Sequence, residues 1–188
     1  MSKCNFEIRK PTLNDLGMLK NFVNSMRNEF LDFEKFLNPN SEVDWSKFKI
    51  YGGHAIEKFS AMGEWLDYLN REENSENMIK TSTYICVDTV HNEIVGIVEI
   101  LHNFVFGLRI YGSNVSLSVV KERRREGIAT MLMNFATLKC KEIGLDKVVV
   151  SFIDYNLAFK ELIERLNFEF VDRIEVYEQI LKKYQLLI

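Results

Sequence analysis

The spacing of hydrophobic residues changes several times along the chain, and each change marks an expected element. Between Thr12 and Phe30 apolar residues recur every three or four positions, which predicts an amphipathic helix. Thr12 precedes this helix and Asp15 follows three residues later, so we expect Thr12 to be its N-cap in a variant capping box. The period is lost from 33 to 54, where we expect an irregular segment. It returns from about Ile56 to Asn70, which predicts a second helix.

The second half of the chain alternates between strand and helix patterns. A short strand is expected at 5–10, and three β-branched stretches at 81–89, 93–102 and 111–120 predict an antiparallel meander, with a charged loop before it and a turn at 90–93. The next helix should bury Ile128, Met131, Leu132, Phe135 and Leu138 and end at Gly144. Further elements are expected as a strand at 146–152, a helix from Asn156, and strands at 168–172 and 174–183.

These elements together predict the fold class and the domain organisation. We expect a mixed α/β fold with a central mixed, mostly antiparallel sheet of roughly six or seven strands and about four flanking helices. The 188 residues suit a single domain over 1–188, with an irregular insertion at about 33–55.

Composition narrows the possible partners. The net charge of −3 argues against bulk binding to nucleic acid or to an anionic membrane, so any basic site must be local. Cys4, Cys86 and Cys140 have neither metal-ligand spacing nor the even number of a disulfide framework. Since no apolar run approaches the length of a membrane span, we expect a cytoplasmic protein with reduced thiols and no bound metal.

The stretch from Val119 to Leu132, "VVKERRREGIATML", carries the clearest chemical signal. A tight turn between a strand and a helix leaves the first N–H groups of the helix unpaired, and the helix dipole makes that end attractive to phosphate. Gly127 and Ala129 would keep the approach to the backbone open, and Arg124 and Arg125 could contact phosphate oxygens. The arginines could equally form a solvated charge cluster. The fingerprints G-x-x-x-x-G-K-[ST] and G-x-G-x-x-G are both absent.

The pattern Arg124-x-x-Gly127-x-Ala129 resembles the acetyl-CoA loop, [RQ]-x-x-G-x-[GA], of the GNAT family of N-acetyltransferases. A second stretch is similar to the family motif N-x-x-A-x-x-L-Y-x-K-x-G-F, and four of its residues are in register: Asn156, Leu162, Arg165 and Phe168. The resemblance covers about 83–173 in detail and is closest to bacterial members.

The resemblance implies an acetyl-CoA-dependent transfer of an acetyl group to a primary amine, by direct attack in a ternary complex. The fourth and fifth strands would splay apart, and acetyl-CoA would lie in the gap. Val119 would hold the pantetheine arm and donate its N–H to the thioester carbonyl, and Asn156 would hydrogen-bond the arm. The pyrophosphate would be bound by backbone N–H groups of the loop, from Arg124, Arg125, Glu126, Gly127, Ile128, Ala129 and Thr130.

The sequence departs from the family pattern at four positions. Ile163 stands where the family has a tyrosine acid, and Phe159 replaces an alanine, which would crowd the pantetheine arm or the acyl pocket and disfavour long acyl chains. Asn167 replaces a glycine, which is tolerable because asparagine also enters the left-handed region. Glu126 is unusual in an anion loop, but its side chain can point to solvent while its N–H points to phosphate.

The proton-transfer groups and the acceptor are less well indicated. Tyr155 could replace the missing acid, and Glu99 could act as the base through a water molecule. His102 lies three residues further along the same strand, so at most one of the two can face the site. The insertion at about 33–55 could form an acceptor wall.

The residues of the insertion that could line this acceptor wall are Trp45, Phe48, Tyr51 and His54. Core packing explains the three aromatic residues equally well. We expect a small-molecule amine or a peptide amine as acceptor and a possible homodimer. The alternative is a catalytically inactive module that senses acyl-CoA, which the loss of the tyrosine at Ile163 favours.

Overall fold

The computed structural model describes residues 5–53, 56–59, 61–69, 80–103, 112–176 and 179–188. The expected charged loop at 70–77 and the first residue of the expected strand at 111–120 lie outside these ranges. The helices and strands are β1 (Phe6–Arg9), α1 (Leu16–Leu37), α2 (Met62–Leu69), β2 (Thr81–Asp88), β3 (Glu93–Leu101), β4 (Val115–Val119), α4 (Ile128–Glu142), β5 (Lys147–Ile153), α5 (Leu157–Arg165), β6 (Glu169–Val176) and β7 (Gln179–Leu187).

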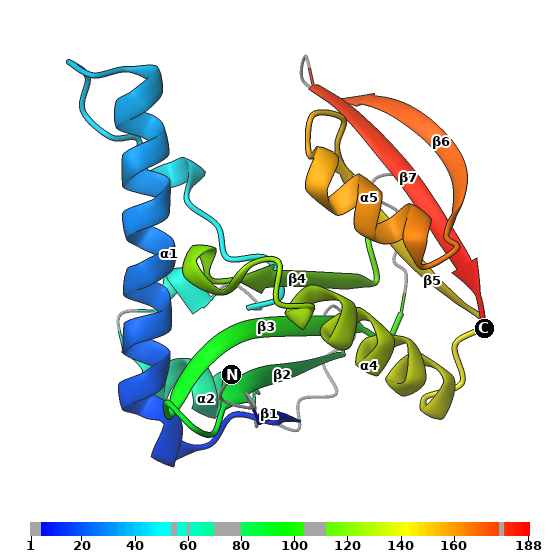
Figure 1. Ribbon diagram of the computed structural model, residues 1–188, viewed down its shortest axis with the longest axis horizontal. Helices are drawn as coiled ribbons and strands as arrows, with labels where there is room; N and C mark the ends of the chain where they lie inside the picture. Colours follow the sequence, from blue (N-terminus) through cyan, green and yellow to red (C-terminus); the bar gives the residue numbers. More distant parts are fainter. Residues whose placement is uncertain (1–4, 54–55, 60, 70–79, 104–111, 177–178) are drawn as a thin grey trace.

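In the described residues the strands form two sheets, and every pairing among them is antiparallel. The first sheet has the order β1-β2-β3-β4, and the second has the order β5-β7-β6. The mixed α/β fold class is therefore confirmed, and the expected central sheet is divided in two between β4 and β5. Figure 1 shows the second sheet rising away from the first, with α5 lying on it and α1 at the far side of the molecule.

The two sheets are joined at one end of the gap between β4 and β5. Asn114, just before β4, is buried, and its backbone N–H donates to the carbonyl of Val149 on β5 at 2.9 Å. Its side chain accepts from the N–H of Val149 at 2.6 Å and donates to the carbonyl of Lys147 at 3.1 Å. The hydroxyl of Ser113 accepts from the N–H of Ser151 at 2.7 Å. The described strand pairings include none between β4 and β5, as is expected if the two strands splay apart beyond this junction.

The N-terminal helix starts as predicted and ends later than predicted. A single 3-10 turn (Leu13–Asp15) follows Thr12, and the carboxylate of Asp15 accepts from the backbone N–H of Thr12 at 2.7 Å and from both ends of the Arg9 guanidinium. Helix α1 then continues past residue 33 because its last turns are built from good helix formers. Phe36 in the last turn is 81% exposed, so this aromatic side chain is not on the buried face of the helix.

The second predicted helix is shorter than expected. Ile56–Lys58 form a separate 3-10 turn, and α2 begins only at Met62. Trp65 of α2 is fully buried, and its Nε1 donates to the carbonyl of Gly53 at 2.9 Å. This bond fixes the end of the irregular segment against α2.

Helix α4 packs on β3 and β4 and ends at Gly144, which has the expected positive φ of 80°. Its predicted buried face is wrong in part, because Leu138 is 60% exposed. The buried residues of the helix are Ile128, Leu132, Met133, Ala136 and Cys140. Gly96 of β3 makes the close packing possible, since a Cβ there would lie 2.9 Å from Leu132 Cδ1.

The last two strands lie further along the chain than predicted, and the turn between them is at a different place. The expected division at residue 173 is wrong, because β6 continues to Val176 and β7 runs from Gln179 to Leu187. The alternation of charged and apolar residues is the same on both sides of residue 173, so the pattern did not locate the turn. In the described part of the chain no helix is both long and apolar enough to cross a membrane.

Candidate functional site

The turn from β4 into α4 has the backbone geometry of an anion-binding loop. A 3-10 turn (Lys121–Arg123) leads into Arg125, with φ of 69°, and Gly127, with φ of 85°, which is the N-cap of α4. Residues that alternate between right- and left-handed conformations turn successive N–H groups toward one concave side, where an anion can bind. A Cβ built on Gly127 would meet no heavy atom within 4 Å, so the space in front of this backbone is open.

Two of the three arginines of this loop are tied to carboxylates of other elements. Arg124 makes a forked ion pair with Glu29 of α1, with both nitrogen–oxygen distances at 2.7 Å, and its Nε donates to the carbonyl of Val119 at 3.1 Å. Arg123 is bound to Asp88, Glu93 and Glu126. Arg125 is 79% exposed at its side chain, and its ion pair with Glu161 of α5 is loose at 3.6 Å. The loop therefore offers an anion its backbone N–H groups more than its guanidinium groups.

The last residue of β4 faces the gap with its backbone. The N–H of Val120 donates to the carbonyl of Val95 on β3 at 3.1 Å, and Val119 lies opposite Gly96. Because successive N–H groups of a strand point to opposite sides, the N–H of Val119 points away from β3 toward the β5 side. Its carbonyl, which shares a peptide group with the N–H of Val120, accepts from Nε of Arg124, so that group is held on both sides.

Glu99 is buried on β3, at 8% exposure, with Thr83 of β2 and Ser116 of β4 directly opposite. Gly96 contacts α4, so Glu99, three residues along, faces the other side of the sheet. Gly52 lies against the backbones of β3 and β4 at that place, because a Cβ on it would be 2.7 Å from the carbonyl oxygen of Ser116. His102 interacts with a different residue of β2, since its Nε2 lies 2.8 Å from the hydroxyl of Ser82. Burial, and after it the positive charges of Lys80 and Lys10, lower the pKa of His102.

Two tyrosines approach each other from different elements near the gap. Tyr155, in the turn before α5, is 71% exposed, and Tyr51, next to Gly52, is 59% exposed. Desolvation, and after it the nearby Tyr155, raise the pKa of Tyr51, so this phenol stays in the protonated form at neutral pH. Of the other expected wall residues, Phe48 is buried in the core, Trp45 packs against Phe30 and Phe48, and His54 lies outside the described residues.

Comparisons with known proteins identify the family. The family model described as "Acetyltransferase (GNAT) family" matches residues 50–168, which is more than half of the chain. The chain belongs to the GNAT acetyltransferase family.

Solved structures of this family share the fold. A GNAT-family acetyltransferase from Streptococcus pneumoniae superposes with a TM-score of 0.62 at 18% identity, over 98% of this chain and 100% of that chain. YncA from Salmonella typhimurium, solved with its cofactor acetyl-CoA, has a TM-score of 0.60 at 13% identity, over 97% and 93% of the two chains. A spermidine N-acetyltransferase chimera from Vibrio cholerae and hSSAT has a TM-score of 0.58 at 15% identity, over 97% and 95%. A search of curated protein sequences found no match.

In this GNAT domain Asn156 is the N-cap of α5. Its Oδ1 accepts from the N–H of Phe159 at 3.2 Å, so its amide NH₂ is the group that can donate to a ligand. The ring of Phe159 packs edge-on against Phe152 of β5 at 5.1 Å, within an aromatic cluster of the second sheet. Arg165 of α5 donates to the hydroxyl of Thr130 on α4 at 3.2 Å, so the two helices are linked beside the gap.

The departures from the family pattern have structural reasons. Ile163, at the position of the family tyrosine, is fully buried and packs in the core, where its side chain has no proton to donate. Asn167 has φ of 61°, which confirms that asparagine occupies the left-handed position of the glycine. Sequence reasoning missed Glu29, Asn114, the role of Arg123 and the proximity of Tyr51 to Tyr155. None of these has a signal in the local spacing.

Proposed function

We propose that the protein is an acetyl-CoA-dependent N-acetyltransferase that transfers the acetyl group to a primary amine. The observation that carries the proposal is the β4–α4 loop, where Arg125 and Gly127 are both left-handed, the space before Gly127 is open, and the N–H of Val119 points to the β5 side. Family membership supports the acetyl donor, and the structure of YncA was solved with acetyl-CoA.

The loop residues from Arg124 to Thr130 would hold the pyrophosphate by their backbone N–H groups. Asn156 would donate its amide to the pantetheine arm, and Val119 would donate its N–H to the thioester oxygen. Bound acetyl-CoA supplies an acetyl group as a thioester, whose leaving thiol has an ordinary pKa of about 8.5. The N–H of Val119 stabilises the negative charge that develops on that oxygen.

The remaining proton transfers are assigned to Glu99 and Tyr155. An alkylammonium acceptor has a pKa of about 10.4, so it must lose a proton before its nitrogen attacks. Glu99, buried on the sheet face beside Gly52, takes that proton through a water molecule. Tyr155, exposed in the turn next to Asn156, protonates the departing thiolate. The acceptor lies against the segment that includes Tyr51, and a spermidine N-acetyltransferase of the same fold makes a polyamine the first acceptor to try.

One observation favours a different function, a module that binds acyl-CoA and regulates without catalysis. The family tyrosine position is occupied by Ile163, which is fully buried. Such a module would bind acetyl-CoA as tightly as an enzyme does but would not release free thiol with any amine. Turnover therefore separates the two functions where binding does not.

Calorimetric titration with acetyl-CoA tests the proposal, and two glycine variants sharpen it. Gly127→Ala places a methyl group in the open space of the loop, and we expect at least about tenfold weaker binding, roughly 1.4 kcal/mol. Gly144→Ala is the matched control, because Gly144 also has positive φ, at 80°, and open space around it, but lies at the other end of α4. Both variants carry the same backbone strain, so only a ligand at the loop distinguishes them.

Each result of the titration and of the turnover assay leads to a different conclusion. A folded wild-type protein that does not bind acetyl-CoA would overturn the proposal, and equal binding by the two glycine variants would move the cofactor away from the loop. If binding is normal, thiol release is measured with spermidine, lysine and peptide amines. Turnover with any of them supports the enzyme, and its absence with all of them supports the sensing module.

A further inference from the structure

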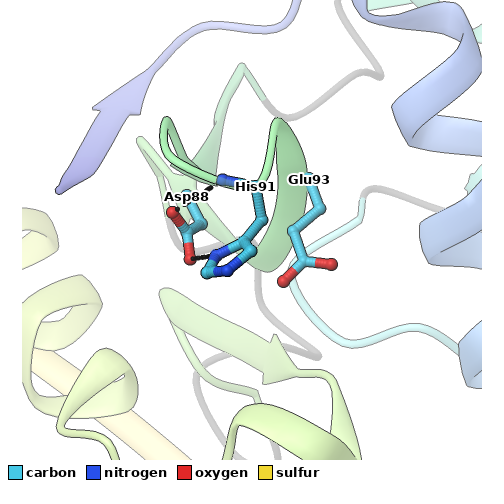
Figure 2. A group of neighbouring side chains, drawn as sticks. All are labelled: Asp88, His91 and Glu93. Atoms are coloured by element: carbon cyan, nitrogen blue, oxygen red, sulfur yellow. Dashed lines mark hydrogen bonds and ion pairs between the residues drawn. The ribbon is translucent and has the colours of Figure 1, made fainter. Parts of the chain in front are cut away.

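A cluster of charged side chains at the β2–β3 turn is not explained by the proposed chemistry. Asp88, the last residue of β2, is fully buried, and its carboxylate accepts from the N–H of Val90 at 2.9 Å and from the Nδ1 of His91 at 2.8 Å. Glu93, the first residue of β3, lies beside them (Figure 2). Ligand atoms of Asp88, His91 and Glu93 lie within 4.8 Å of one another, as in a metal site.

The cation that these carboxylates bind is a guanidinium from the β4–α4 loop. Arg123 donates to Asp88 Oδ2 at 2.9 Å and is hydrogen-bonded to Glu93 through its other terminal nitrogen. Its Cζ also lies 5.7 Å from the centre of the Phe6 ring, and the side chain is only 14% exposed. The cluster therefore anchors Arg123, and a metal ion would have to displace it.

The same guanidinium also binds the loop itself. Its Nε donates to Glu126 at 2.9 Å, and its Nη2 donates to the other oxygen of that carboxylate at 3.0 Å. The Arg123–Glu126 pair spans Arg124 and Arg125, and Arg125 has the strained φ of 69°. Burial alone would raise the pKa of Asp88, but the bonds from His91 and Arg123 and from two backbone N–H groups hold it well below its usual range, so the anchor is charged at neutral pH.

We propose that Arg123 is a positioning residue for the acetyl-CoA loop. It connects buried Asp88 to Glu126 and thereby holds the left-handed turn between them ready for the pyrophosphate. This inference rests on the proposed function. It also explains why an acidic residue, Glu126, is placed in a loop for an anion, since its carboxylate is the loop-side partner of Arg123 rather than a contact of the ligand.

The sign of one mutational effect tests the inference. Simple electrostatics predicts that removal of a carboxylate beside a pyrophosphate strengthens binding. Positioning predicts weaker binding for Glu126→Ala, because the bond from Arg123 to Glu126 that spans the turn is lost. We expect the dissociation constant for acetyl-CoA to rise by about fivefold to tenfold. Glu122→Ala is the matched control, since Glu122 is an exposed carboxylate of the same segment, and we expect its affinity to stay equal to wild type or to increase slightly.

Asp88→Asn separates positioning from direct contact. If Arg123 acts through its bond to Asp88, this variant weakens acetyl-CoA binding even though Asp88 belongs to β2 and not to the loop. If Arg123 is itself a phosphate ligand, freeing it from Asp88 leaves binding equal or tighter. Arg123→Lys, which keeps the charge but cannot bridge three carboxylates, should recover only part of the affinity that Arg123→Gln loses.

Steady-state kinetics adds a measurement that loss of stability does not change. A positioning role raises the KM for acetyl-CoA at constant kcat, measured below the unfolding transition of each variant. Tighter or unchanged binding by both Glu126→Ala and Asp88→Asn would overturn the inference. Wild-type binding of acetyl-CoA is measured first, so a failure of the proposed function is recognised before any variant is interpreted.

Discussion

The junction between the two sheets can be tested by replacing Asn114 with alanine. The side chain of Asn114 makes two hydrogen bonds to the backbone of β5, at 2.6 Å to the Val149 N–H and 3.1 Å to the Lys147 carbonyl. Alanine removes both and leaves a buried donor and a partly buried acceptor without partners. An orphaned buried group costs about 1–3 kcal/mol, so we expect the free energy of unfolding to fall by about 2–4 kcal/mol.

Urea unfolding, followed by fluorescence and circular dichroism, measures this change. The slope of the unfolding free energy against urea concentration should stay the same, because the surface exposed on unfolding changes little. Asn134→Ala is the control, since Asn134 is exposed on α4, and we expect a change of less than about 0.5 kcal/mol. A loss of less than about 1 kcal/mol in Asn114→Ala would refute the reasoning, because it would mean that the orphaned groups find other partners.

Two further predictions concern the loop and the N-terminal cap. Arg125→Gly removes a side chain from a left-handed position and should raise the free energy of unfolding by about 0.5–1 kcal/mol in the same urea assay, whereas a decrease would mean that the ion pair with Glu161 outweighs the strain. Asp15 has its pKa lowered from 3.8 to about 2 by Arg9 and Thr12 against the opposing effect of burial, so it contributes about 2 kcal/mol above pH 4 that is lost as the pH falls toward 2. Thermal unfolding between pH 2 and 7 should show this loss in the wild type, and a profile that is equally steep in Asp15→Asn would contradict it.

The parts of the fold that local spacing determines were predictable from the sequence. Thr12 and Asp15 begin the first helix, Gly144 ends α4, and Asn156 is the N-cap of α5, because each acts on groups within a few residues of itself. The order of strands and helices and the left-handed Asn167 followed for the same reason.

The pairings across the sequence could not be predicted in this way. Arg124 and Glu29 are 95 residues apart, and Arg123 and Asp88 are 35 apart, so no periodicity relates them. The sequence indicated that the arginines were available to a phosphate, and only the fold shows that two of them are bound to carboxylates. The sequence did not predict that α1 extends to Leu37. Phe36 in its last turn is exposed, so the hydrophobic period of the buried face does not continue there.

The pairing of Arg123 and Arg124 with carboxylates bears on how selective an anion site at this loop can be. With Arg123 and Arg124 paired to carboxylates, a ligand at the loop meets fixed peptide dipoles rather than mobile charges, and its binding releases few counter-ions. The affinity for acetyl-CoA should then change little between low and physiological salt. Nucleotides and other polyanions that compete through charge alone would gain little from this surface, so recognition would depend on the shape of the ligand.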